Sequence, residues 1–321
     1  MGIAMRDCRP GALSRRRVLA GGGFIGIALA VPGWNIFAAA HAESAPLATR
    51  PIPHSGEALP VIGLGTANGF DRGDEPVRQA ARAAVIRTLV AAGATLIDTA
   101  PSYGNAESVI GALVADAGLR DRVFLATKLE SYDRATGPAA LQASLRRLRT
   151  ERLDLMQLHN VRDANQDLAM LRDWKAQGLC RYTGITTTNR HAFDAAEAVL
   201  RREKPDFLEI DYSLDDREAE KRLLPAAAEV GAAVLTALPF GRGRLFRAVQ
   251  GQAVPDWAAA FGADSWGRFF LKYLLGNPAV TAVIPGTTSE DHMADNLGAG
   301  RGRMPDAAER RKMVDFIAGL G

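Results

Sequence analysis

Cysteine is scarce in this chain of 321 residues, which contains only Cys8 and Cys180. Cys8 lies in an amino-terminal segment that we expect to be removed, and Cys180 then remains alone. A single cysteine can form neither an intramolecular disulfide nor a cysteine-ligated metal site, even in an oxidising compartment. We therefore predict neither feature, and we assign no residue as a metal ligand.

An excess of charge of one sign is missing as well. The whole chain has 39 Lys and Arg residues against 36 Asp and Glu residues, a formal net charge of +3. Residues 1–42 contain five of the arginines and one aspartate, so the remainder has 34 basic and 35 acidic residues and a net charge of −1. A near-neutral surface gives no support for nucleic-acid binding.

The first 42 residues have the composition of an export signal. Arginines between positions 6 and 17 form a basic start, residues 18–40 are almost purely apolar, and Ala40-His41-Ala42 offers a cleavage site. Ser14-Arg15-Arg16-Arg17-Val18-Leu19 resembles the twin-arginine export signal of bacteria. We therefore predict a twin-arginine signal peptide over residues 1–42 and a folded domain over residues 43–321.

Two alternatives to this interpretation are an ordinary secretory signal and an uncleaved anchor. Gly21, Gly22, Gly23 and Gly26 dilute the hydrophobicity of the apolar segment, which favours the twin-arginine route. That route implies a periplasmic protein with the twin-arginine translocase as its partner during export. It leaves no stable membrane span after cleavage.

Residues 43–58 are predicted to be an extended leader, and short apolar runs typical of strands then recur along the chain. A helical pattern separates each run from the next. The predicted strands are Val61–Thr66, Thr95–Thr99, Val123–Thr127, Leu153–Leu158, Tyr182–Thr186, Phe207–Asp211, Ala233–Leu238 and Ala282–Ile284.

The predicted helices are amphipathic, with apolar residues at helical spacing. The first has Val77, Ala81, Val85 and Leu89 on one face and ends at Gly93. Two later stripes consist of Leu141, Leu145 and Leu148, and of Leu168, Leu171 and Trp174. Each helix thus has one face that can cover a sheet.

Eight strand–helix units in this length match a (β/α)8 TIM barrel, and continuous apolar runs are typical of parallel strands buried on both faces. A doubly wound open sheet is the alternative. However, no G-x-G-x-x-G follows the first strand, and Val61–Thr66 does not open directly into a helix. We predict a single α/β barrel without repeats or low-complexity linkers, and an extra carboxyl-terminal helix near Asp306–Ala318.

Four polar residues follow three successive predicted strands. Asp98 and Tyr103 follow the second strand, Lys128 ends the third, and His159 ends the fourth. Each residue alone has a plain structural explanation, such as capping a helix or reaching solvent. Because the carboxyl ends of parallel strands meet at one end of a barrel, we expect all four to share one pocket.

These residue types suit acid–base chemistry on a carbonyl group. A lysine at the end of an apolar strand needs a partner, and Asp98 is the natural one. The Lys128 cation is expected to lower the pKa of Tyr103 from about 10 towards the range of a general acid. His159 can hydrogen-bond a substrate carbonyl oxygen and orient it.

The sequence resembles the aldo-keto reductase family over residues 59–300. The segments that resemble it are Gly63–Thr66, Asp98–Glu107, Thr127–Lys128, Asp154–His159, Pro239–Gly243 and Ile284–Asn296. The resemblance implies NADPH-dependent reduction of small aldehydes or ketones, or the reverse oxidation. It makes Asp98, Tyr103, Lys128 and His159 the catalytic residues, with Tyr103 protonating the carbonyl oxygen as hydride arrives from the nicotinamide.

The resemblance also implies a dinucleotide that lies extended over the barrel end, NADP with NAD as the alternative. The residues implied to bind it are Thr66, Asp98, Thr186, Thr187, Glu209, Leu238, Phe240, Gly241, Gly243, Gly286, Thr287, Thr288, His292 and Asn296. For residues 286–296 the alternative is a plain strand–turn–helix, with Thr287 or Ser289 as the helix N-cap.

Several of these positions depart from the family pattern. Thr186 and Thr187 replace the usual Ser-Asn that holds the carboxamide, and Glu209 stands where glutamine is expected. The aromatic residue that often stacks on the nicotinamide is absent from residues 236–239. Gly286 and His292 stand where Lys or Arg often grips the 2′-phosphate. We therefore expect weaker discrimination between NADPH and NADH.

The segment Arg242–Asp264 is predicted to be a long loop that acts as a flap over the cofactor, with packing on the barrel rim as the alternative. Phe70 and Trp257 are predicted to form an apolar substrate wall.

Two candidate functions follow from the sequence. The first is an exported NAD(P)-dependent oxidoreductase acting on small carbonyls. The second is a non-catalytic exported barrel that binds a nucleotide or small ligand as a sensor.

Overall fold

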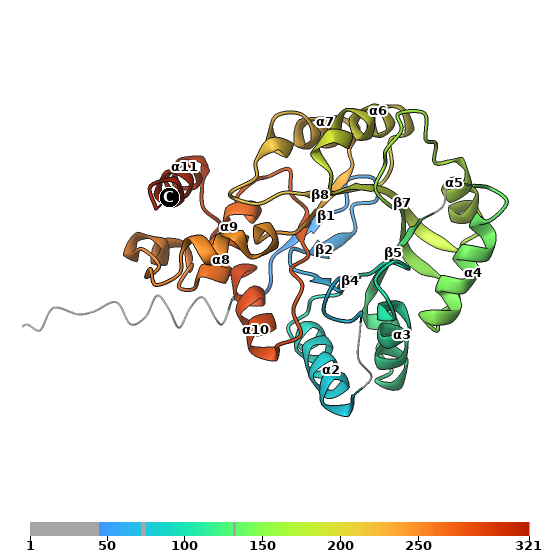
Figure 1. Cartoon of the computed structure of the whole chain (residues 1–321), viewed down its shortest axis with the longest axis horizontal. Helices are drawn as coiled ribbons and strands as arrows, with labels where there is room; N and C mark the ends of the chain where they lie inside the picture. Colours follow the sequence, from blue (N-terminus) through green and yellow to red (C-terminus); the bar gives the residue numbers. More distant parts are fainter. Residues whose placement is uncertain (1–44, 72–74, 131–132, 321) are drawn as a thin grey trace, which may run out of the picture. The chain divides into compact units, whose positions relative to one another are not determined.

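Eight short parallel strands form the centre of the fold, and each pairs with the next in chain order (Figure 1). The computed structural model describes residues 45–71, 75–130 and 133–320, so the predicted signal peptide lies outside the described residues. The strands are β3 (Leu64–Gly65), β4 (Leu96–Asp98), β5 (Phe124–Leu129), β6 (Leu153–Leu158), β7 (Cys180–Thr187), β8 (Phe207–Asp211), β9 (Ala233–Ala237) and β10 (Ala282–Val283).

The sheet closes on itself between its first and last strands. Val283 N donates to Val61 O at 3.0 Å, and Gly63 N donates to Val283 O at 2.9 Å. Ile62 also forms a parallel bridge with Val283. The predicted (β/α)8 barrel is therefore confirmed, and each predicted strand is present.

Helices surround the strands, as Figure 1 shows. They are α2 (Pro76–Ala91), α3 (Ala106–Asp116), α4 (Gly137–Arg147), α5 (Ala169–Ala176), α6 (Phe193–Glu203), α7 (Leu223–Val230), α8 (Arg244–Ala248), α9 (Trp266–Leu275), α10 (Glu290–Ala299) and α11 (Ala307–Ala318). The predicted apolar stripes are buried, except that Ala81 is half-buried and Val77 in the first turn of α2 is 81% exposed. In the described part of the chain, no helix is both long enough and apolar enough to cross a membrane.

The predicted leader is wrong in part, because its second half forms a hairpin. β1 (Thr49–Pro51) pairs antiparallel with β2 (Ala58–Pro60). Ile52 and Leu59 are at most 1% exposed and pack inside the barrel with apolar residues of the parallel strands. Arg50 donates to the carbonyl groups of Leu275, Asn277 and Val280, at and just beyond the end of α9, which ties the hairpin to the barrel wall.

The predicted carboxyl-terminal helix is confirmed as α11. Asp306 accepts hydrogen bonds from Ala308 N and Glu309 N, and the Glu309 side chain accepts from Asp306 N, which makes a capping box. Arg310 on this helix donates to Tyr212 Oη at 2.7 Å and pairs with Glu220 at 2.6 Å. α11 is thus fixed to the outside of the barrel by buried polar contacts.

The segment Arg242–Asp264 is not the open loop that was predicted. It contains α8 and a 3₁₀ helix, η5 (Asp256–Phe261). Leu245 and Phe261 are at most 2% exposed, because they pack into the main apolar core. The segment therefore packs on the barrel rim, which was the alternative interpretation.

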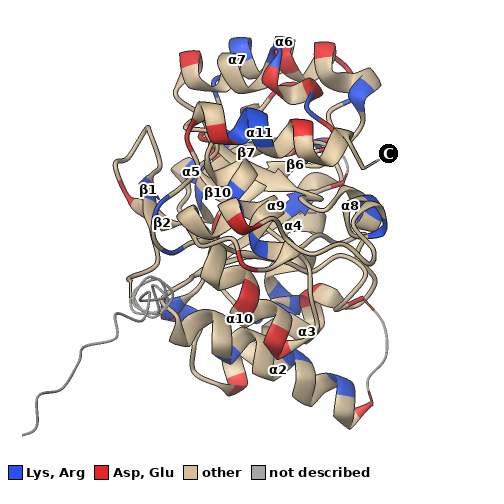
Figure 2. Cartoon of the chain, turned by 90° about the vertical axis from the view of Figure 1, so that its left-hand side faces the viewer, with Lys and Arg blue, Asp and Glu red and all other residues tan. Residues whose placement is uncertain are grey.

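Basic and acidic residues both occur along the helices that Figure 2 draws, among them α6, α7, α10 and α11. This distribution agrees with the near-neutral charge of residues 43–321.

Candidate active site

The four predicted catalytic residues lie at one end of the barrel. Asp98 is the last residue of β4, Tyr103 is in the following loop, Lys128 is near the end of β5, and His159 directly follows β6. Asp98, Tyr103 and His159 line a hollow of about 930 Å³ at the carboxyl ends of the strands, and Lys128 lies buried beneath it. The register of three neighbouring strands thus brings together residues that are up to 61 positions apart in sequence.

Lys128 is the centre of a buried polar cluster. Its Nζ lies 2.5 Å from Asp98 Oδ2 and 3.2 Å from Glu209 Oε2, and it donates to Thr99 O at 3.2 Å. Gln157 Nε2 donates to Glu209 Oε2 at 2.8 Å and to Asp98 Oδ1 at 3.4 Å. The expected Lys128–Asp98 pair is present, and the Glu209 carboxylate joins it.

Asp98 and Glu209 compete for one ammonium group, and this competition changes the pKa of Asp98. Burial raises the pKa of Asp98, the Glu209 charge raises it further, and the nearby Lys128 only partly offsets both, so that the pKa is about 8. For Lys128, burial lowers the pKa, but attraction to Asp98 and Glu209 outweighs it and the net pKa is raised. Lys128 therefore stays charged, and the pKa of Asp98 is the one that lies near neutral pH.

The predicted lowering of the Tyr103 pKa is wrong. Burial raises the pKa of the phenol to about 12, and the Asp98 and Glu209 charges also raise it. Lys128, whose Nζ lies 5.3 Å from the ring centroid, lowers the pKa by less than these effects raise it. Tyr103 is therefore a protonated phenol throughout the neutral range, which is the form that a proton donor needs.

His159 is oriented by a carboxylate that the sequence interpretation missed. Its Nδ1 lies 2.6 Å from Glu130 Oε1, and its ring meets Tyr103 edge-on with the centroids 6.0 Å apart. Burial raises the pKa of Glu130, but hydrogen bonds from His159 and Ser102 outweigh it and lower the pKa to about 2. An ionised Glu130 accepts from Nδ1–H, which fixes the ring beside Tyr103. The only sequence signal was a carboxylate two residues beyond Lys128.

The residues predicted to bind a cofactor fall into two groups. Those that line the hollow are Thr66, Asp98, Glu209, Leu238, Phe240, Gly243, Gly286, Thr287 and Thr288. The others do not line it, namely Thr186, Thr187, Gly241, His292 and Asn296. Thr186 Oγ1 instead accepts from Asn160 N at 2.8 Å, and the Thr187 hydroxyl donates to Asn189 O at 3.3 Å.

Further lining residues escaped the sequence interpretation, among them Asn160 and Thr188. Asn160 has a left-handed φ of 54°, and its Oδ1 accepts from the Thr188 backbone and hydroxyl groups at 3.3 Å. Asparagine directly after a strand is a known turn signal that could have indicated this position.

Arg242 supplies a cation at the rim of the hollow. Its φ is 53°, and its neighbours Gly241 and Gly243 also have positive φ values of 55° and 80°. Arg244 is paired with Asp215 at 2.8 Å, whereas no carboxylate of the described residues forms an ion pair with Arg242. Arg242 is therefore available to bind an anionic group of a ligand.

Neither Phe70 nor Trp257 forms the predicted substrate wall. Phe70 is fully buried beneath Arg82, whose guanidinium lies 5.7 Å from the ring centroid. Trp257 packs against Phe269 and Phe316 at centroid distances of 5.8 and 6.1 Å. Both rings serve the core, because the segments that carry them fold inward onto neighbouring helices.

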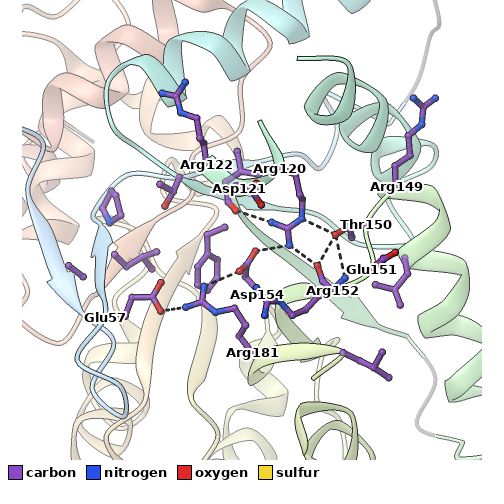
Figure 3. A pocket seen from close by; sticks show the side chains of 18 of the residues that line it. Glu57, Arg120, Asp121, Arg122, Arg149, Thr150, Glu151, Arg152, Asp154 and Arg181 are labelled. Atoms are coloured by element: carbon purple, nitrogen blue, oxygen red, sulfur yellow. Dashed lines mark hydrogen bonds and ion pairs between the residues drawn. The ribbon is translucent and has the colours of Figure 1, made fainter. Parts of the chain in front are cut away.

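A second hollow of about 1190 Å³ lies at the opposite end of the barrel (Figure 3). Its most central charges satisfy one another: Asp154 pairs with Arg120 at 3.1 Å and with Arg181 at 3.0 Å. Figure 3 shows Arg122 and Arg149 extending away from this group. The arginines here stabilise the amino ends of the strands, and the acid–base residues all lie at the other end.

The hollow at the carboxyl end fits an extended dinucleotide in size and in donor set. Ligand sites in proteins typically have volumes of about 300–1,000 Å³. Glu209 and the small Ala237 line the same hollow as Tyr103. The rim adds Arg242 and the backbone of residues 286–288, which suit phosphate groups.

Comparison with known proteins agrees with this geometry. Residues 61–309 match the model of the Aldo/keto reductase family. Methylglyoxal reductase YeaE of Escherichia coli (strain K12) is 29% identical over 253 residues, which cover 76% of this chain and 87% of that protein. L-galactose dehydrogenase of Arabidopsis thaliana is 25% identical over 286 residues, with coverage of 78% and 87%.

Solved structures give the same result. An aldo/keto reductase from Klebsiella pneumoniae in complex with NADP and acetate has a TM-score of 0.70 and 25% identity, covering 84% of this chain and 95% of that chain. An aldo-keto reductase from Klebsiella pneumoniae in complex with NADPH has a TM-score of 0.69 and 26% identity, with the same coverage.

A closed (β/α)8 barrel with acid–base residues at its carboxyl end defines a class of barrel enzymes. Within that class, the chain belongs to the aldo/keto reductase family and is an NAD(P)-dependent oxidoreductase.

Proposed function

We propose that this protein reduces small aldehydes or ketones with NADPH, and catalyses the reverse alcohol oxidation, with Tyr103 as the general acid. The observation that carries this proposal is the cluster of Tyr103, Lys128, Asp98 and His159 at one hollow. The phenol is protonated at neutral pH because burial raises its pKa to about 12. His159, held by Glu130, is the group that would orient the carbonyl oxygen.

NADP(H) is the cofactor of this function, with NAD(H) as the alternative. Two family members from Klebsiella pneumoniae with the same fold were solved with NADP and NADPH. In this chain Glu209 would accept from the carboxamide, and Arg242 would bind phosphate oxygens. When bound, the dinucleotide supplies the hydride. His292 lies on α10 and does not line the hollow, whereas Arg242 does, so we expect Arg242 to contribute more to phosphate binding.

The first carbonyl compound to test is methylglyoxal, the substrate in the name of the Escherichia coli relative. We expect Tyr103→Phe to lower the turnover of NADPH with methylglyoxal or a simple aldehyde by about 10²–10⁴-fold, the usual contribution of general acid catalysis. Tyr182→Phe is the matched control, because Tyr182 lies at the other end of the barrel and donates to Glu57 at 2.6 Å. Wild-type turnover by Tyr103→Phe would rule out its role.

A second candidate function is a barrel that binds a nucleotide without turning it over. The observation that favours it is that the floor of the hollow departs from the family pattern. Glu209 adds a carboxylate to the cluster, and Ala237 offers no aromatic ring to stack on a nicotinamide. A wild-type protein that binds NADPH but consumes none with a broad panel of aldehydes and ketones would support this function and exclude the first.

We also propose that residues 1–42 direct the protein to the periplasm by the twin-arginine route. The support is the sequence Ser14-Arg15-Arg16-Arg17-Val18-Leu19 before an apolar segment. We expect the double variant Arg15→Lys, Arg16→Lys to stay in the cytoplasm, folded and able to bind NADPH. Cell fractionation followed by immunoblotting measures this, and undiminished export of the double variant would contradict the proposal.

A further inference from the structure

The floor of the hollow contains a second carboxyl group, Glu209, in addition to the proposed catalytic residue Asp98. Lys128 Nζ lies 2.5 Å from Asp98 and 3.2 Å from Glu209, and Gln157 donates to Glu209 at 2.8 Å. All four side chains are at most 2% exposed. The cluster therefore sets two carboxyl groups against one ammonium group at a deeply buried position.

The surroundings of Glu209 add no second positive charge. The ionisable groups that face it are Lys128 from β5, Asp98 from β4 and Tyr103 from the loop after β4. Its neighbours in the sheet are Thr186 on β7 and Leu235 on β9, which carry no charge. A buried cluster with a net charge of −1 is unfavourable, and two adjacent carboxyl groups in such a place share a proton.

We propose that Glu209 makes this cluster hold one exchangeable proton, which leaves when the nicotinamide ring in the hollow becomes a cation. This inference rests on the proposed function, because it requires a nicotinamide dinucleotide in the hollow. Glu209 lines the hollow, so its charge acts on a ring bound there. A neutral ring favours the singly protonated pair, and a positive ring favours the pair with both carboxylates ionised.

The proton balance of carbonyl reduction fits this role. One hydride adds to the carbonyl carbon, and one proton passes from the Tyr103 hydroxyl to the oxygen. Lys128, whose Nζ lies 5.3 Å from the Tyr103 ring centroid, then gives a proton to the phenolate and regains one from the Asp98–Glu209 pair. The phenol is restored, Lys128 stays charged, and the pair is left doubly ionised beside the oxidised ring. With glutamine at 209, the Lys128–Asp98 pair is already neutral and holds no spare proton.

The test is the ratio of the dissociation constants of NADPH and NADP⁺, measured by calorimetry from pH 6 to pH 9. In the wild type we expect this ratio to rise by about tenfold or more between pH 6 and pH 9. It rises because binding of NADP⁺ releases a proton and binding of NADPH does not. One proton limits the slope to at most about tenfold per pH unit. The ratio should level off at the pH where the NADPH complex has also lost this proton, because the two complexes then hold the same number of protons. In Glu209→Gln it should change by less than about twofold over the whole range.

Two further variants make the result decisive. Asp211→Asn removes a carboxylate from the same strand that does not line the hollow, and it should keep the wild-type dependence on pH. Glu209→Asp keeps the charge and should keep the rise as well. If Glu209→Gln retains the rise, another group such as His159 carries the proton and the inference is overturned. If the wild type binds neither form of the dinucleotide, the proposed function itself fails.

Discussion

At the scale of single residues, burial and a neighbouring cation act in opposite directions on Tyr103. A cation near a phenol was expected to make it more acidic, but burial together with the Asp98 and Glu209 charges raises its pKa to about 12. The place of Tyr103 in the site could be predicted, because Tyr103 closely follows the end of a predicted strand. Its acidity could not, because it depends on how deeply three strands bury the cluster and on Glu209, which comes from a distant strand.

The same limit explains which site residues were missed. Glu130 contacts His159, and Asn160 and Thr188 line the hollow, only because the register of β5, β6 and β7 places them there. By contrast, the positions of Asp98, Lys128 and His159 follow from the rule that parallel strands of a barrel end together. His292 was expected at the cofactor because of its position in a pattern; it lies on α10 and does not line the hollow, so its contact with a cofactor stays a prediction.

Lys272 gives a prediction about stability that is independent of catalysis. It is fully buried on α9 and donates to Arg301 O at 2.7 Å and Arg303 O at 3.0 Å. Burial, followed by the charges of Arg268 and Arg303, lowers its pKa from 10.5 to about 8. Between these two values the unfolded chain binds the proton that the folded protein has released, so stability rises with pH in that window.

The free energy of unfolding should therefore increase from pH 8 to pH 10 relative to Lys272→Met, by at most about 1.4 kcal/mol per pH unit. Urea unfolding at pH 7.5, 9 and 10 measures this difference. Lys221→Met, which removes an exposed lysine, is the control and should follow the wild type. An equal pH dependence in Lys272→Met and the wild type would show that Lys272 titrates normally in the folded state.

At the scale of elements, continuous apolar runs were enough to locate the eight strands of the barrel. The β1–β2 hairpin was missed because its strands have only three residues each and contain Arg50, Pro51 and Pro60. The segment after β9 was read as a loop because α8 has only five residues and glycines and prolines interrupt its neighbourhood. Short elements of this kind form only through packing against the rest of the barrel.

The attachment of α11 can be tested through one side chain. Arg310 pairs with Glu220 at 2.6 Å and donates to Tyr273 O at 3.0 Å and Tyr212 Oη at 2.7 Å. Arg310→Ala removes the cation beside Glu220, which then keeps only the hydroxyl donors of Tyr212 and Tyr273. We expect a loss of about 2–3 kcal/mol in the free energy of unfolding. Amide exchange should accelerate across α11 in this variant.

Arg311→Ala serves as the matched control for α11, because Arg311 is exposed on the same helix. It should change the free energy of unfolding by no more than about 0.5 kcal/mol. Equal stability of Arg310→Ala and Arg311→Ala would mean that apolar packing alone holds α11 in place.

At the scale of the whole molecule, the two ends of the barrel have different roles. At the amino end, the hairpin and the Arg120–Asp154–Arg181 group close the interior with paired charges. At the carboxyl end, the acid–base cluster opens into the hollow. This division agrees with barrel enzymes in general, where residues at the carboxyl ends of strands carry the chemistry.

The proposed export adds a constraint on the cofactor. The twin-arginine route carries folded proteins, so a dinucleotide bound in the cytoplasm can leave the cell inside the barrel. If this happens, protein purified from the periplasm should contain bound dinucleotide that survives dialysis. Mass spectrometry of the released ligand measures this, and an empty protein that binds added NADPH only weakly would contradict it.

The most direct test of the central claim is a single turnover with NADPH that carries deuterium at both C4 positions. Purified protein is mixed with methylglyoxal, and the product is examined by mass spectrometry. The account predicts an alcohol with one deuterium on the former carbonyl carbon. It also predicts about 10²–10⁴-fold slower formation by Tyr103→Phe at unchanged NADPH affinity. A product without deuterium, or wild-type speed in Tyr103→Phe, would contradict it.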